Sequence, residues 1–268
     1  MRIASATAFA QGSRAQIGAL PVDTFVILSA TAGAFLLAGF VKGVIGLGLP
    51  TVSIGLLGLL MSPAQAAAIL VVPSLVTNIW QAATGGGVVA LTRRLWPMLT
   101  GICVGTFVGA VLIPHDDSGR ATIGLGLALV LYSALGLIKG HFSVPRHAEG
   151  WLGLLMGTAT GAITVATGIF VIPGTPYVQS LQFERDKMVQ VLGLSFTVST
   201  ITLGIALAYA GQMRTSLAWP SLVALAMALA GMWLGQLVRG RVKAETFRLC
   251  FFIGLLLLGA HLALRGLL

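Results

Sequence analysis

Long apolar runs, interrupted by short polar segments, make up most of this chain of 268 residues. The predicted long helices cover 24–42, 65–83, 95–113, 121–138, 151–167, 187–209, 217–238 and 246–264. Each is close to the roughly 20 residues that a membrane-spanning helix needs. Two further helices, over 49–60 and 169–180, are too short, because twelve residues extend only about 18 Å. We interpret each as half of a broken or re-entrant element.

The chain also resembles itself at a constant spacing. Gly39 and Gly43 in "GFVKGVIG" correspond to Gly157 and Gly161 in "GTATGAIT", 118 positions later, and "SLVTNIW" aligns with "SFTVSTI". This pattern predicts an all-α polytopic membrane protein with two repeats, each containing a broken helical hairpin and three transmembrane helices. The predicted parts are an N-terminal tail over 1–23, repeats over 24–140 and 151–268, and a linker over 141–150.

Charge is scarce and unevenly placed. Only 9% of residues are charged and the mean hydropathy is +0.98, which is typical of a membrane protein and not of a soluble domain. The pI is 10.6, but the basic residues collect in short segments between apolar runs. We interpret them as orientation signals, and we expect no nucleic-acid partner.

Loop charge also predicts how the repeats are oriented. If each broken element enters and leaves on one side, ten basic residues share one face: Arg93, Arg94, Lys139, Arg146, Arg185, Lys187, Arg239, Arg241, Lys243 and Arg248. Five lie on the other: Arg2, Arg14, Arg120, Arg214 and Arg265. The richer face is predicted to be cytoplasmic, so the two repeats are inverted. If the broken elements crossed once, the basic residues over 239–248 would move to the opposite face.

Lys42 is a cation inside an apolar run. All seven acidic residues of the chain lie at predicted helix ends or in loops, so none is available to pair with Lys42 at membrane depth. A buried cation costs about 2.5–3.5 kcal/mol even on the insertion scale, and it is expected to face a cavity or an anion. The alternative is that Lys42 ends its helix and extends to the lipid headgroups.

The glycines after Lys42 favour a binding site. Gly46 and Gly48 allow the chain to turn, and a helix that restarts near Thr51 leaves N–H groups that attract anions. A break of this kind survives in a membrane only inside protein or beside water. We therefore predict an anion site from Lys42, Gly46, Gly48 and Thr51.

Other polar residues are expected to complete the site. The second break contributes hydroxyls, and the helices that follow both breaks contribute amides and further hydroxyls. These candidates are Thr160, Thr164, Thr167, Asn78, Gln81, Gln190, Ser195 and Ser199. The alternatives are that the threonines bond to carbonyls one turn back in their own helix, and that the others form interhelical hydrogen bonds.

Other sequence features are expected to be structural. Gly101, Gly105 and Gly109, like Gly153, Gly157 and Gly161, recur every four residues, which favours close helix packing or a homodimer face. The cysteines and histidines do not have metal-ligand spacing, so neither a metal nor another cofactor is expected. Hydrolase motifs are also absent, which argues against an intramembrane enzyme.

At the two breaks the chain resembles the TauE/SafE family of bacterial sulfite and organosulfonate exporters. The resemblance rests on "GFVKGVIGLGLPTVSIGLLG" with "AAAILVVPSLVTNIWQ", and on "GLLMGTATGAITVATGIFVIPG" with "VLGLSFTVSTI". It extends over nearly the whole chain and implies a carrier of small sulfur-containing or carboxylate anions in the bacterial plasma membrane. The family pattern often has more glycine than "ITVATG", which leaves the role of the second break open.

The expected function is therefore export of a small anion by alternating access, with membrane lipid around the protein. A negative cell interior favours anion exit by about 2.3 kcal/mol per charge and 100 mV. The sequence has no deep carboxylate for coupling to protons or sodium. The alternatives are an anion channel and a cation-coupled importer.

Overall fold

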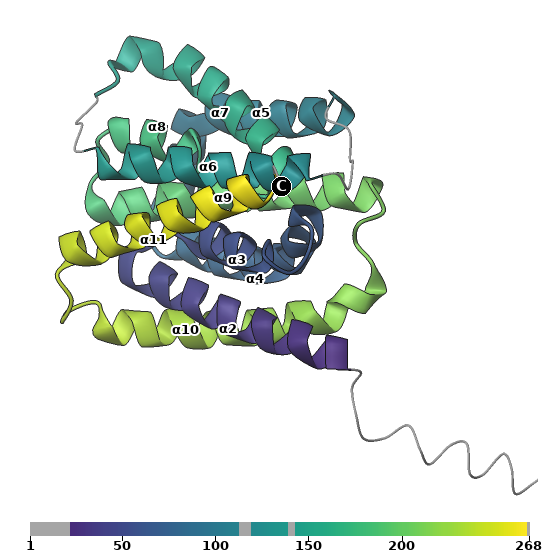
Figure 1. Ribbon diagram of the computed structural model, residues 1–268. Helices are drawn as coiled ribbons and strands as arrows, with labels where there is room; N and C mark the ends of the chain where they lie inside the picture. The colour runs from purple at the N-terminus through teal and green to yellow at the C-terminus, as the bar shows by residue number, and fades with distance from the viewer. Residues whose placement is uncertain (1–21, 113–118, 139–142, 267–268) are drawn as a thin grey trace, which may run out of the picture.

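The computed structural model describes residues 22–112, 119–138 and 143–266, which form helices joined by short turns (Figure 1). In chain order these are α2 (Val22–Ile45), α3 (Leu49–Leu57), α4 (Pro63–Ala83), α5 (Val88–Leu112), α6 (Arg120–Leu137), η1 (Arg146–Ala148), α7 (Glu149–Thr167), α8 (Gly174–Ser180), α9 (Arg185–Tyr209), η2 (Thr215–Leu217), α10 (Ala218–Val238) and α11 (Ala244–Arg265). Within the described residues, eight helices are long and apolar enough to cross a membrane: α2, α4, α5, α6, α7, α9, α10 and α11. The prediction of an all-α polytopic membrane protein is confirmed. The first 21 residues of the predicted tail, with Arg2 and Arg14, and Lys139 in the first predicted repeat lie outside the described part.

Two predicted helix starts were wrong. α5 begins at Val88 instead of 95, so Arg94 belongs to its first turns, and Pro97 lies inside the helix. An arginine near a helix end can extend beyond the apolar core, so its charge did not mark a loop. The second short helix begins at Gly174 instead of 169, because Gly168 takes a left-handed conformation (φ 75°) and the chain leaves the helix there.

α2 and α10 interlock through glycines. A Cβ added to Gly39 or Gly43 of α2 would fall on a backbone carbonyl oxygen of α10. Reciprocally, a Cβ on Gly231 or Gly235 of α10 would fall on a carbonyl oxygen of α2. The contacts advance in the same direction along both helices, so this pair is parallel, with its backbones in direct contact.

α5 and α7 form a second crossing of the same kind. A Cβ on Gly101 or Gly105 of α5, or on Gly157 or Gly161 of α7, would fall on a carbonyl oxygen of the facing helix. The glycines of α7 lie 118 positions after those of α2, and the glycines of α10 lie 130 positions after those of α5. The predicted role of these glycine stripes in helix packing is confirmed, and both partners belong to the same chain.

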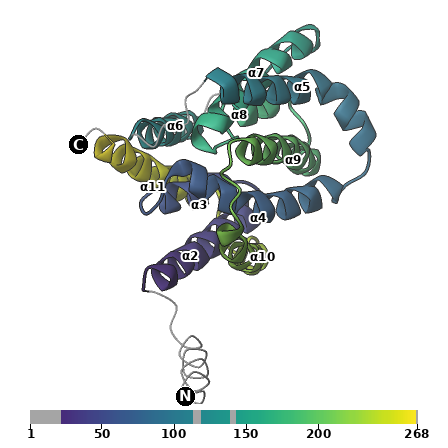
Figure 2. The same ribbon diagram turned by 90° about the vertical axis from the view of Figure 1, so that its right-hand side faces the viewer.

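The other long helices form two antiparallel pairs. Gly193 of α9 lies against Ala82 of α4, and Gly204 lies against Val71, so the two helices run in opposite directions. α6 and α11 are also antiparallel, with Gly126 against Gly259 and Gly119 against Gly266. Figure 2 shows α4 and α9 between the pair α5–α7 and the pair α2–α10, with α6 and α11 to one side.

A bidentate ion pair closes one end of the second crossing. Arg94 of α5 donates to both carboxylate oxygens of Glu149 at the start of α7, at 2.9 and 2.7 Å. Its guanidinium also lies over the ring of Phe183, 4.5 Å from the centroid. Arg265 at the end of α11 instead donates to the carbonyl of Leu59, which follows α3. Because Arg94 contacts both Glu149 and Phe183, one end of the molecule contains the starts of α5 and α7 and the segment that leads into α9.

Candidate anion site at the first helix break

The first break is a three-residue turn between α2 and α3. Gly46 and Gly48 have φ angles of 81° and 109°, in the left-handed region that favours glycine. Pro50 then lies in the first turn of α3, where its missing N–H costs nothing. α2 ends at Ile45, and Lys42 lies in its last turn. Lys42 is therefore at the carbonyl end of the helix, where a cation is favoured.

Lys42 is buried, and its partners come from α4. Its side chain is only 5% exposed. Its Nζ donates to Thr77 Oγ1 at 3.0 Å and to Asn78 Oδ1 at 2.5 Å. The alternative that Lys42 extends to the lipid headgroups is therefore wrong.

Among the described residues, the ammonium of Lys42 has only neutral partners. Neither of the ion pairs found among the described residues includes Lys42. An ammonium has three donors, and its hydrogen bonds to described residues use two of them. The remaining donor has no partner in the part of the chain that the structure describes.

A polar network continues from Lys42 into α9. Asn78 Nδ2 donates to Ser74 Oγ at 2.9 Å and to Thr200 Oγ1 at 3.3 Å. The Ser74 and Thr200 hydroxyls are 3.2 Å apart. These donations orient the amide oxygen of Asn78 toward Lys42. Sequence reasoning missed Thr77 and Thr200, although its candidate Ser199 is one position away from the hydroxyl that Asn78 contacts.

Two glutamines hold the ends of α2, α4 and α9 together. Gln81 Nε2 donates to the carbonyl of Gly46 at 2.8 Å, which supports the turn itself. Gln190 Nε2 donates to the carbonyls of Ala82 and Gly85, at 2.9 and 3.1 Å. The amide nitrogens of Gln81 and Gln190 thus form hydrogen bonds between helices, which is the alternative considered for these residues.

Two buried oxygens near this network have no hydrogen-bond partner among the described residues: Gln81 Oε1 and Ser195 Oγ. Ser199, one turn along α9, donates to the Ser195 carbonyl at 3.0 Å. A buried hydroxyl without a partner costs free energy. Ser195 can donate to an anion, and Gln81 Oε1 can accept from a protonated ligand or water.

The residues that begin α3 lie farther from this network. A Cβ on Gly48 would be 2.8 Å from Val41 Cγ1 and 3.3 Å from the Phe251 ring, so this glycine faces apolar side chains. Thr51 is buried, and its hydroxyl donates to the Gly48 carbonyl at 3.0 Å. The structure therefore brings together Lys42, Gly46, Asn78 and Gln81, while Gly48 and Thr51 mainly form the turn.

The threonines at the second break bond to their own helix. The hydroxyls of Thr160, Thr164 and Thr167 each donate to the carbonyl four residues earlier, all at 2.7 Å. Thr167 also accepts from the N–H of Ile169 at 3.1 Å. This outcome is the alternative that the sequence left open, because the three hydroxyls bond to carbonyls within α7.

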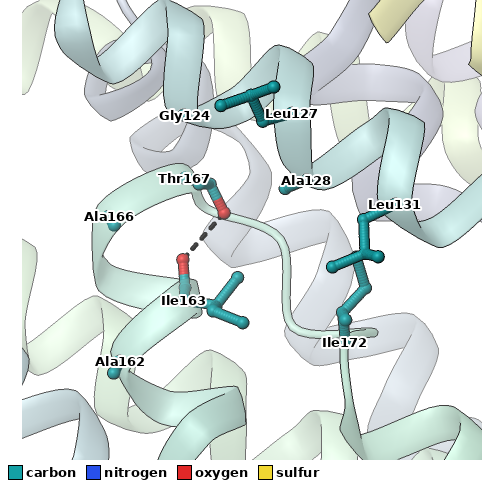
Figure 3. A pocket seen from close by; sticks show the side chains of 9 residues that line it. All are labelled: Gly124, Leu127, Ala128, Leu131, Ala162, Ile163, Ala166, Thr167 and Ile172. Atoms are coloured by element: carbon teal, nitrogen blue, oxygen red, sulfur yellow. Dashed lines mark hydrogen bonds between the residues drawn. The ribbon is translucent and has the colours of Figure 1, made fainter.

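Thr167 also borders a groove between α6 and α7, with a volume of about 380 Å³. The other lining residues are apolar, and Figure 3 shows the Thr167 hydroxyl directed to the Ile163 carbonyl. A groove of this composition offers no cation to an anionic group. Among the described residues, no cluster of three or more His, Cys, Asp or Glu side chains is placed to bind a metal.

These features define a multi-pass helical membrane protein with a buried, carboxylate-free cation at a helix break. A family model described as "Sulfite exporter TauE/SafE" matches residues 31–262. The chain therefore belongs to the TauE/SafE family of membrane transporters, as its resemblance at the two breaks indicated. No curated protein and no solved structure matches it.

Proposed function

We propose that this protein exports small sulfur-containing or carboxylate anions across the bacterial plasma membrane by alternating access. The observation that carries the proposal is the burial of Lys42, whose ammonium has two neutral partners and one unused donor within the described part of the chain. An anion beside it would offset the desolvation of the ammonium. Asn78, Ser195 and the α2–α3 turn would surround the anion, and the membrane potential would drive its exit.

We further propose that the two repeats are inverted. The constant spacings of 118 and 130 positions at the two glycine crossings support this arrangement. So do the antiparallel pairs α4–α9 and α6–α11, because a two-fold axis perpendicular to these helices exchanges the partners of each pair. The shared end of α5, α7 and α9 agrees with the basic face predicted to be cytoplasmic.

The test is anion flux from proteoliposomes at several imposed potentials, with sulfite, a short alkanesulfonate and a small carboxylate as probes. We expect saturable flux that rises with the outward driving force. Lys42→Gln should abolish it, because glutamine keeps a polar side chain but removes the charge. Flux that does not saturate would instead indicate a channel.

Lys187→Gln is the matched control. It removes the same charge from an exposed lysine, which lies 3.9 Å from a carboxylate oxygen of Glu184. Flux should therefore remain at the wild-type level. Equal flux for Lys42→Gln and wild type would overturn the proposed site, and absence of flux for every anion would overturn the proposed function.

A further inference from the structure

The contacts between helices divide the protein differently from its sequence. α2 and α10 interlock backbone to backbone, and so do α5 and α7, yet each pair joins helices from opposite halves of the chain. α4 packs on α10, and α9 packs on α5. The result is two interleaved bundles: the α2 bundle (α2, α4 and α10) and the α7 bundle (α5, α7 and α9).

The bundles meet mainly along α4 and α9. At one end of this interface a Cβ on Gly193 would be 2.6 Å from the backbone nitrogen of Ala82, as at the glycine crossings, but the rest of the interface differs from them. Its middle is formed by side-chain hydrogen bonds, from Ser74 and Asn78 to Thr200. Toward Gly204 the helices are separated by the Val71 side chain, 3.2 Å from where a Cβ would lie. Side-chain hydrogen bonds can exchange partners during a sliding motion, whereas interlocked backbones have to separate first.

Glycines mark the connections between the bundles. The chain passes from α4 to α5 through Gly85, Gly86 and Gly87, and from α9 to α10 through a turn that contains Gly211. A Cβ added to Gly86, Gly87 or Gly211 would meet nothing within 4 Å. Apart from Gly85, which lies against Gln190, these connections are therefore loosely packed, as hinges need to be, while the bundles that they join are tightly packed.

We infer that the moving bodies in transport are these two interleaved bundles, sliding along α4–α9, and not the two sequence repeats. The inference rests on the proposed transport function. It places the anion site at the moving surface, because Lys42 reaches Thr200 of the opposite bundle through Asn78. Anion binding at Lys42 then acts directly on the hydrogen bonds that hold the bundles together.

Two cysteine pairs distinguish the alternatives, in a background with Cys103→Ser and Cys250→Ser. Val71→Cys with Gly204→Cys joins the two bundles across α4–α9. Gly109→Cys with Val165→Cys joins α5 to α7 within one bundle, where a Cβ on Gly109 would be 2.7 Å from Val165 Cγ1. Each pair links one glycine and one valine position, and each joins the two sequence repeats.

We expect the disulfide across α4–α9 to abolish sulfite flux and its reduction to restore it, while the α5–α7 disulfide leaves flux unchanged. Loss of flux with both disulfides would mean that the repeats move as bodies. Retention with both would mean that α4–α9 does not move, and either result overturns the inference. Absence of flux from the reduced parent would count against the transport function instead.

Distances between spin labels test the same inference without a disulfide. Trp96 of α5, Trp151 of α7 and Trp233 of α10 are exposed and can be replaced by labelled cysteines in pairs. The 151–233 distance should change when sulfite is added, although both positions belong to the second repeat. The 96–151 distance should stay constant, although it joins the two repeats. The reverse pattern, or two constant distances, would overturn the inference.

Discussion

At the first helix break the polar side chains reach other helices, whereas at the second they return to their own. Lys42 donates to α4, and Gln81 of α4 donates back to Gly46. Thr160, 118 positions after Lys42, donates to Met156 within α7. The glycines that pack the helices are conserved between the two halves of this chain, but the residues that carry charge are not.

The two breaks also differ in how much space surrounds them. A Cβ on Gly46 would lie 3.7 Å from its nearest neighbour, Val189, whereas one on Gly168 would be 2.5 Å from Ile54 Cδ1 and 3.1 Å from Ala67 Cβ. At Gly46 the first break is less crowded than the second break at Gly168, although Gly48 is packed against Val41 and Phe251. The second break is filled by α3 and α4. The comparison supports the proposal that the first half contributes the anion site, while the second break is the more tightly packed.

Among substitutions of the residues around Lys42 and at the second break, Asn78→Asp should have the largest effect, because it changes the charge balance at the first break. Asn78→Asp would place a carboxylate beside Lys42, neutralise it and repel an anion. We expect flux to fall about 100-fold, which is about 2.8 kcal/mol at 1.4 kcal/mol per factor of ten. Thermal unfolding in detergent should show no loss of stability. Gln179→Glu adds the same charge at an exposed position and should leave flux unchanged.

Asn78→Leu separates the two roles of this residue, since it removes the acceptor without adding a charge. Lys42 would keep only Thr77, and the unfolding free energy should fall by about 1–3 kcal/mol. A variant that is as stable as wild type would contradict the importance of this hydrogen bond. Measuring both Asn78 variants thus shows whether the site fails through charge or through folding.

Alanine at the two left-handed glycines should lower stability more at the second break than at the first. Gly46→Ala costs about 1–2 kcal/mol for a left-handed alanine. Gly168→Ala adds about 1–3 kcal/mol of overpacking against Ile54 and Ala67 to the same strain. Unfolding in mixed micelles measures both. Equal losses would show that Ile54 and Ala67 adjust, and that the second break is not the more rigid one.

The smallest effects are expected at the second-break hydroxyls. Thr160→Val and Thr164→Val remove hydrogen bonds within α7 only, so stability should change by less than about 1 kcal/mol and flux should hardly change. Thr77→Val provides the comparison, because the same substitution removes an acceptor of Lys42. If Thr164→Val reduced flux as much as Thr77→Val, the second break would share in anion binding.

Sequence reasoning identified Lys42 because a lone cation in an apolar run is conspicuous, and it placed Asn78 and Gln81 near the break because they are polar residues on the helix that follows it. It could not identify Thr77 or Thr200, since many hydroxyls lie on these helices and only the rotation of α4 against α9 selects those two. It also could not say where each threonine proton points, because an intrahelical carbonyl and a ligand compete for the same donor.

Helix boundaries failed for a related reason. Arg94 looked like a loop residue, but Glu149 and Phe183 hold its side chain while its backbone remains helical. Such partners lie far away in sequence and have no local signature. The glycine stripes, in contrast, had a local signature, and only the identity of the facing helix required the structure.

The glycine crossings also determine the order in which this protein can assemble during synthesis. Gly105 and Thr158 of the α5–α7 crossing are 53 residues apart, but Gly39 and Gly231 of the α2–α10 crossing are 192 apart. At about 5–20 residues per second, α2 waits about 10–40 s for α10 to leave the ribosome. The helix that carries Lys42 therefore spends this interval with its glycine face against lipid or an insertion factor, and nascent chains that end before α10 contain the α5–α7 crossing alone.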